Sequence, residues 1–350
     1  MISSSCSAVD AMTDALPGAP AVVSAASASL LAIDEESAGQ RLDNFLMRHL
    51  KGVPKTHIYR IIRSGEVRVN KGRAAADTRV ELGDVVRLPP VRVSERMAEK
   101  AEAMAVATTA AGSRAAPARE FPIVFEDEHV LAIDKPAGVA VHGGSGVSFG
   151  VIEQLRIARP QAKYLELVHR LDRDTSGILL IAKKRSALKH LQDQFRERET
   201  GKTYLALVLG VWPAKLKVID APLHKYLLTN ADGSEGERRV KVVAKDDPDG
   251  MRSITLVKVA QQLKDHALLE VTIKTGRTHQ IRVHLASQGH PIAGDDKYGN
   301  FEVNKALAKA GLKRMFLHAW RLSFNHPATS DRVELMAVLP PELRHFSGPS

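Results

Sequence analysis

The segment HRLDRDTSGILLIA, residues 169–182, joins a charged loop directly to an apolar run. Five consecutive apolar residues, 178–182, are typical of a strand that is buried on both faces. Two carboxylates, Asp172 and Asp174, stand just before that run among two arginines and a histidine. A structural turn explains part of this pattern, and the surrounding sequence has to show whether the charges serve another purpose.

Strand-like runs continue on both sides of this segment. They cover residues 121–125, 130–134, 178–182, 204–209, 254–259, 268–273, 321–324 and 333–339. Helical spacing of apolar residues interrupts them at 186–198 and 279–288. The succession lacks a regular β-α-β alternation, so we expect an α+β domain at 119–345 with a large mixed, mainly antiparallel sheet.

Two alanine-rich stretches set the predicted domain boundaries. Residues 1–33 hold nine Ala, seven Ser and no Lys or Arg, which predicts a disordered tail over 1–35 without a basic leader. Residues 97–118 hold ten Ala in 22 positions, which favours a linker over 96–118. No apolar run is long enough to span a bilayer, and the single Cys6 excludes an internal disulfide. We therefore expect a cytoplasmic protein with no membrane partner.

The small domain predicted at 36–95 is strongly basic. Between Arg41 and Arg92 there are twelve Lys or Arg against five Asp or Glu, a local +7 out of +10 for the whole chain. A solvated helix face explains any one arginine, but this asymmetry favours a surface that follows the phosphates of a nucleic acid. The pattern RLDNFL…THIYRIIRSGEVRVN in this region resembles the S4 RNA-binding domain, a small α/β fold. That resemblance implies RNA contacts by Arg41, Lys55, His57, Arg60 and Arg63.

Several other chemistries lack their motifs. Residues 144–150 read GxGxxxG instead of the dinucleotide fingerprint, and no GxxxxGK[ST] phosphate loop occurs. Ser176 is not framed as GxSxG, so a hydrolase nucleophile is unsupported. His279 and His284 stand five residues apart, so a structural or RNA-contacting role is favoured over a zinc pair. We expect no metal and no cofactor.

Four motifs occur in a fixed order: KPAG at 135–138, HRLDRDTSG at 169–177, KTYLALV at 202–208 and TGRTHQIRVH at 275–284. Together they resemble the RluA-type pseudouridine synthases across nearly all of 119–345, and most closely the RluC branch. The resemblance implies the pseudouridine synthase fold and cofactor-free isomerisation of uridine. It also implies 23S ribosomal RNA or a large-subunit precursor as the partner of a monomer.

The resemblance also assigns roles within these motifs. Asp172 is implied as the catalytic carboxylate, Arg282 as its ion-pair partner, and Tyr204 as a wall for the uracil and a candidate acceptor of the C5 proton. Arg170 is implied to enter the base stack when the uridine is flipped out. Arg277 and His279 complete the implied RNA-binding set. The residues alone do not separate Asp172 from Asp174, which is expected to cap the following turn.

Two alternatives stay open at the level of sequence. A non-catalytic RNA-binding or ribosome-assembly protein would use the small domain and a degenerate large domain, and would not need Asp172, Tyr204 and Arg282 together. A metal-dependent nuclease built on Asp172 and Asp174 would be stopped by EDTA and would shorten its RNA.

Overall fold

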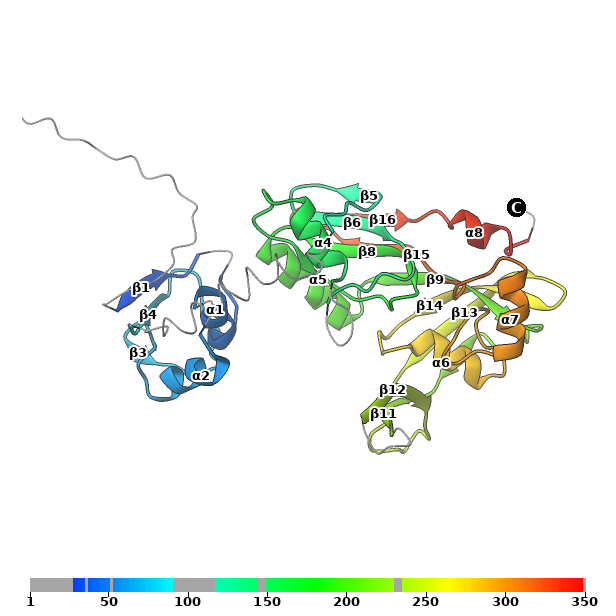
Figure 1. The fold of residues 1–350 in the computed structure, drawn as a ribbon, viewed down its shortest axis with the longest axis horizontal. Helices are drawn as coiled ribbons and strands as arrows, with labels where there is room; N and C mark the ends of the chain where they lie inside the picture. The colour runs from blue at the N-terminus through cyan, green and yellow to red at the C-terminus, as the bar shows by residue number, and fades with distance from the viewer. Residues whose placement is uncertain are drawn as a thin grey trace, which may run out of the picture. The chain divides into compact units, whose positions relative to one another are not determined.

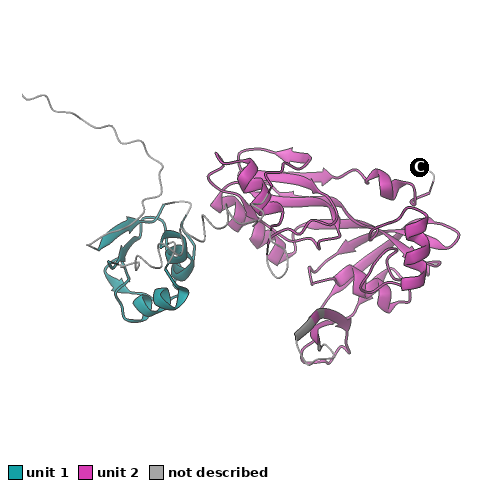
Figure 2. Ribbon diagram, viewed as in Figure 1, with its two compact units in different colours: residues 1–106 teal, residues 107–350 magenta. Residues whose placement is uncertain are grey.

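The computed structural model describes residues 28–34, 37–50, 53–90, 117–143, 149–229 and 235–348. The chain divides into two units, residues 1–106 and 107–350 (Figure 2). Most of the predicted tail and linker, and the centre of the GxGxxxG loop, lie outside the described residues.

The first unit packs two helices against a small sheet. Helix α1 spans Leu42–His49 and α2 spans Lys55–Arg63. The sheet runs β1-β4-β2-β3, with β1 Ser29–Ala32, β2 Arg68–Val69, β3 Gly72–Arg73 and β4 Val85–Leu88. Apolar stripes on the two helices form its core, with Phe45, Leu46 and Ile61 at most 1% exposed. Gly65 follows α2 with φ +77°, the left-handed conformation in which glycine commonly ends a helix.

The predicted tail is wrong at its C-terminal end. Strand β1 lies within residues 1–35, yet it pairs antiparallel with β4 from Ser29–Leu88 to Ala32–Val85. Ile33, directly after β1, is 2% exposed in the core of this unit. A four-residue edge strand of Ser, Leu and Ala has little local signal, because its stability comes from a partner more than fifty residues away.

The second unit is built on a ten-stranded sheet, ordered β10-β13-β14-β9-β15-β8-β6-β5, with β16 on β15 and β7 on β8 (Figure 1). All pairs are antiparallel except β8 with β15, so the predicted mixed, mainly antiparallel sheet of an α+β domain is confirmed. The strands are β5 Ile123–Glu126, β6 Val130–Lys135, β7 Glu166–Leu167, β8 Ser176–Ala182, β9 Gly201–Leu209, β10 Val218–Asp220, β13 Ile254–Gln262, β14 His266–Ile273, β15 Leu317–Asn325 and β16 Arg332–Met336.

Strand β8 shows why the opening segment decides this fold. All seven of its residues are buried, and they alternate between the two faces of the sheet. Leu179 and Ile181 pack in the core that holds α4, Val151–Ala158, and α6, Gln280–Ser287. Ile178 and Leu180 pack on the opposite face against α5, Arg185–Glu197. The charged loop is therefore anchored to a strand with helices on both sides.

Gly177 allows β8 to approach its parallel neighbour. Its φ is +108°, and a Cβ at this position would overlap the backbone of Ala319 on β15. Only glycine fits such a contact without displacing a strand.

Several elements had no sequence prediction. They are α4, β10, α7 Phe301–Lys309, α8 Pro341–Arg344 and the hairpin of β11 Leu223–Thr229 with β12 Glu235–Val242. These elements are short, or pair only with each other, so their apolar patterns are weak. Among the described helices, none combines the length and the apolar character needed to cross a membrane.

Candidate active site

Three of the four motifs, HRLDRDTSG, KTYLALV and TGRTHQIRVH, meet at one cleft in the second unit, with a volume of about 590 Å³. The loop before β8, the start of β9, the end of β14 and the start of α6 supply its walls. Its lining includes seven cationic side chains: Arg170, Arg196, Arg198, Lys202, Lys274, Arg277 and Arg282. Among the described residues that line the cleft, Asp172 is the one carboxylate. Such a cationic surface suits the binding of a polyanion.

Asp172 lies in the loop between β7 and β8, with its side chain 28% exposed. The loop is closed by a hydrogen bond from the Thr175 amide to the Asp172 carbonyl, 3.2 Å. The Asp174 carboxylate accepts hydrogen bonds from the Arg173 guanidinium at 3.2 and 3.3 Å. We expected Asp174 to cap this turn, but the Thr175 amide bonds to the backbone carbonyl of Asp172 instead. The two carboxylates thus have different surroundings, and only Asp172 lines the cleft.

The KPAG turn is hydrogen-bonded to the loop that carries Asp172. Lys135 is fully buried, and its Nζ donates to the carbonyls of Pro136, Val139 and Arg173 at 2.8–3.0 Å. The Gly138 amide donates to the same Arg173 carbonyl, 2.9 Å. Burial lowers the pKa of Lys135 to about 7, while the charges of Asp174 and Asp172 raise it. Because three carbonyls match the three N–H donors of an ammonium group, Lys135 ties the KPAG turn to the backbone that follows Asp172.

His169, the first residue of the loop, is structural. Its Nε2 accepts from the Leu180 amide at 3.0 Å, and its ring stacks on Phe195 of α5 at 4.9 Å. Burial lowers the pKa of His169 to about 3, so the imidazole is neutral. The sequence suggested a charged group here, but this histidine fastens the loop to β8 and α5.

Arg282, the third residue of α6, has its Nη1 3.3 Å from the Asp172 carboxylate. Its Nε and Nη2 each donate to Asp295 at 2.8 Å, and the Asp295 side chain is fully buried. Burial alone would lower the pKa of Arg282, but the hydrogen bonds and charge of Asp295, with the charge of Asp172, raise it. The arginine is therefore a fixed cation, oriented by Asp295 toward Asp172.

Tyr204 of β9 lines the cleft and is 9% exposed. Burial, together with the negative charge of Asp172, raises the pKa of its hydroxyl. Tyr204 is thus a neutral phenol at physiological pH, which suits it to contact a base and makes proton loss from its own oxygen costly.

Arg170 and Arg277 are exposed at the cleft, and neither guanidinium has an ion-pair or hydrogen-bond partner within the described part of the chain. Gln280 and Thr275 shape the loop that carries Arg277. The Gln280 Oε1 accepts from the Thr275 hydroxyl at 2.7 Å and from the Arg277 amide at 3.1 Å. Within the described residues, both arginines are therefore unpaired cations at the edge of the cleft, and hydrogen bonds of Gln280 hold the loop of Arg277.

The two histidines of the TGRTHQIRVH motif have separate environments. His284 is fully buried and bonded to Thr255 and Ala221, which is a structural role. His279 precedes α6 in the left-handed region, φ +51°, and places its Nε2 3.9 Å from Asp172. They do not share a site, as their five-residue spacing predicts.

Comparison with known proteins agrees with these motifs. Residues 129–287 match the RNA pseudouridylate synthase family model, and residues 40–86 match the S4 domain model. Ribosomal large subunit pseudouridine synthase C of Pasteurella multocida (strain Pm70) is 50% identical over 91% of this chain and 93% of its own length. The protein of that name from Escherichia coli (strain K12) is 50% identical over 89% of this chain and 93% of its own.

The chain belongs to the RluA-type RNA pseudouridine synthases. Its similarity to the curated relatives places it in the branch of ribosomal large subunit pseudouridine synthase C. Among solved structures, human RNA pseudouridylate synthase domain containing 4 is similar over 64% of this chain and 90% of its own, at 26% identity and a TM-score of 0.52.

The S4 domain of this synthase carries most of its predicted RNA-facing residues on α2. Lys55, Arg60 and Arg63 are exposed, on the side opposite the buried isoleucines. Arg60 contacts His57 at 3.2 Å. Arg41 differs, because its guanidinium makes two hydrogen bonds of 3.1 and 2.8 Å to a nearly buried Asp43 at the start of α1. Arg41 is thus partly engaged in holding its own helix.

Sequence reasoning missed two groups of this synthase's site, one buried behind the cleft and one lining it. Asp295, which orients Arg282, lies in the segment GDDKYG at 294–299, where no element was predicted. Lys202 was noted only as part of a motif, yet it lines the cleft with its Nζ 5.1 Å from the centre of the Phe195 ring. The acidic pair followed by tyrosine and glycine in GDDKYG is the signal that could have found Asp295.

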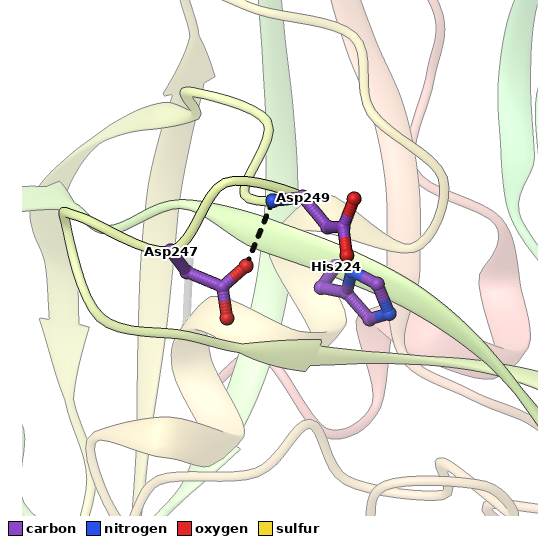
Figure 3. A group of neighbouring side chains, drawn as sticks. All are labelled: His224, Asp247 and Asp249. Carbon is purple, nitrogen blue, oxygen red and sulfur yellow. Dashed lines mark hydrogen bonds between the residues drawn. The ribbon is translucent and has the colours of Figure 1, made fainter.

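His224, Asp247 and Asp249 form a separate cluster, with ligand atoms within 4.8 Å of one another (Figure 3). The Asp249 amide donates to the Asp247 carboxylate at 2.9 Å, as the figure shows. None of the three lines the cleft. Asp249 is exposed and the other two are partly so, as is common for acidic side chains without an ion, and we assign no metal to them.

Proposed function

We propose that this synthase converts uridines of 23S ribosomal RNA, free or in a large-subunit precursor, to pseudouridine, acting in the cytoplasm as a monomer without cofactor. The names of the relatives support this choice of RNA, and the basic S4 domain supports a structured polyanion. The observation that carries the proposal is the position of Asp172 in a cationic cleft, 3.3 Å from an arginine that Asp295 holds in place.

The reaction explains the need for such a carboxylate. Isomerisation breaks the N1–C1′ bond of uridine, joins C5 to C1′, and transfers the C5 proton to solvent while N1 takes up a proton. Atoms and electrons balance without a redox partner, so the demands are a nucleophile or a negative charge near the sugar and the base. In the proposal Asp172 supplies that group. Arg282, which Asp295 holds in place, puts a fixed positive charge 3.3 Å from this carboxylate.

Base flipping is the proposed route of the uridine into the cleft. Extrusion of a base from folded RNA costs a few kcal/mol. Arg170 lines the cleft, and its guanidinium has no partner among the residues that the structure describes, so it can enter the gap that the uridine leaves. Arg277, His279 and the exposed cations of α2 are proposed to hold the flanking RNA, and Arg41 to contribute through its exposed edge.

Tyr204 is proposed to pack against the flipped uracil. Because the pKa of its hydroxyl is raised, the oxygen can accept the C5 proton only if it passes its own proton onward. Tyr204→Phe separates the two roles, since packing survives the change and proton relay does not.

The test is release of tritium from C5-labelled uridines in unmodified 23S ribosomal RNA, with no added metal or nucleotide. We expect the wild type to release it and Asp172→Asn to lose activity by at least about 10⁴-fold while still binding the RNA. Asp174→Asn is the matched control, because it removes the neighbouring carboxylate that pairs with Arg173 outside the cleft. Turnover near wild type in Asp172→Asn would remove that residue from the mechanism.

A further inference from the structure

Tyr298, in the GDDKYG segment, contacts both groups that flank Asp172. Its ring lies 5.2 Å from the Arg282 guanidinium and 5.6 Å from the His279 ring. Its hydroxyl is 2.8 Å from His279 Nδ1. Its amide donates to Asp295 at 3.0 Å, so the loop that orients Arg282 also places Tyr298.

The hydroxyl of Tyr298 has a second partner on the β11–β12 hairpin. The amide of Val240, a residue 5% exposed on β12, donates to it at 3.1 Å. Val240 packs with Leu223 of β11 and Val283 of α6, which joins the base of the hairpin to the helix that carries Arg282. Figure 1 shows the hairpin projecting from the rest of the second unit beside α6.

Proton counting assigns the direction of the hydrogen bond to His279. An amide can only donate, so the Val240 N–H takes a lone pair of the Tyr298 oxygen. The phenol has one proton of its own, and His279 Nδ1 is the remaining partner among the hydrogen bonds of the described residues. If Nδ1 carried a proton instead, the phenol proton would be left without an acceptor there. The arrangement therefore favours an unprotonated Nδ1 and a protonated Nε2.

The environment of His279 supports a neutral imidazole in a fixed orientation. Burial lowers the pKa of His279; Arg282 and Lys297 lower it further, and Asp172 and Asp295 oppose them. Its left-handed backbone, φ +51°, is unusual for a residue with a side chain and costs about 1 kcal/mol, which neighbouring contacts must offset. His279 Nε2 is 3.9 Å from the Asp172 carboxylate, too far for a direct hydrogen bond.

We propose that Tyr298 is a positioning residue that fixes the Nε2–H tautomer of His279, so that this imidazole presents an N–H donor beside Asp172 to an acceptor oxygen of the bound uridine. The inference deepens the proposed function and rests on it. It assigns His279 the task of recognising the nucleoside within the cleft, and it makes the hairpin part of the support of the site through Val240.

The first test is the tautomer itself, which needs no turnover. In protein labelled with ¹⁵N-histidine, the ring nitrogen shifts at pH 8 should show His279 with Nδ1 bare and Nε2 protonated, with His279→Ala assigning the signals. Tyr298→Phe should give a mixture of tautomers, and Tyr226→Phe, which removes a tyrosine hydroxyl of β11 instead, should leave the signals unchanged. A wild-type Nδ1–H tautomer would overturn the proposal even if tritium release had confirmed the activity.

The second test asks whether Tyr298 acts through His279. Tyr298→Phe should lower kcat about tenfold with little change in KM, as expected when an oriented histidine loses its outer partner. In a His279→Ala background the same change should cost less than about twofold, because the group that it positions is gone. Independent, multiplying losses would overturn the proposal. If no RNA supports turnover by the wild type, the proposed function fails and the tautomer measurement still decides this inference.

Discussion

At the scale of single residues, the site depends on which charges are paired. Arg282 is held by Asp295, Asp174 by Arg173, and Lys135 by three carbonyls. Arg170 and Arg277 line the cleft without an ion-pair or hydrogen-bond partner for their guanidinium groups in the described ranges. Paired groups set geometry, and free groups are available to an RNA phosphate or base stack.

Replacement of Arg170 tests the free cation. We expect Arg170→Ala to lower kcat/KM about a hundredfold on folded ribosomal RNA, because a few kcal/mol of unstacking must then come from other contacts. On an unstructured oligonucleotide the loss should be below about fivefold. Arg173→Ala is a control that removes an exposed charge of the same loop. Equal losses of Arg170→Ala on both substrates would contradict a role in flipping.

Replacement of Asp295 tests whether this carboxylate orients Arg282. Asp295→Asn breaks a buried ion pair, so we expect the free energy of unfolding to fall by about 3 kcal/mol and kcat to fall at least tenfold. Asp296→Asn is the matched control, because Asp296 is 75% exposed and 3.5 Å from the same guanidinium. Urea unfolding and tritium release measure the two effects. Similar behaviour of both variants would mean that Asp295 does not orient Arg282.

At the scale of elements, α2 of the S4 domain offers a row of exposed cations. We expect the triple change of Lys55, Arg60 and Arg63 to Ala to weaken binding to 23S ribosomal RNA and to reduce the slope of log K against log salt by about 2 to 3, because each phosphate contact releases a counterion. The matched control removes three exposed lysines at α7 and just after it, Lys305, Lys309 and Lys313. An unchanged slope in the α2 variant, measured by filter binding, would show that α2 does not contact phosphates.

The other elements differ in how much local information they carry. Strand β8 was predictable because it contains five consecutive apolar residues, 178–182, and α5 because Ala187, Leu188 and Leu191 repeat at helical spacing. The β11–β12 hairpin was not predictable, since each strand pairs only with the other and much of its surface is polar. Its role beside Tyr298 depends on packing against α6, and a contact between distant segments cannot be predicted from the local sequence pattern.

At the scale of the whole molecule, the two units have separate cores, one under the S4 helices and others around the large sheet. We therefore expect residues 107–350 to fold alone and to keep kcat on a short uridine-containing oligonucleotide within about threefold. On 23S ribosomal RNA the KM should rise at least tenfold, because the basic unit is gone. Thermal unfolding checks the fold, and an unfolded or inactive fragment would show that the units depend on each other.

The sequence by itself determined the fold class and the division into a basic small domain and a synthase domain. It also determined the group of motifs that contains Asp172, Tyr204 and Arg282. It could do so because buried strands, helical stripes and sequence motifs are local patterns. Only the tertiary structure decided that Asp295 holds Arg282, that Lys135 supports the Asp172 loop, and that Tyr298 joins His279 to the hairpin. These partners are separated along the chain, and a hydrogen bond between them exists only once the sheet has brought the loops together.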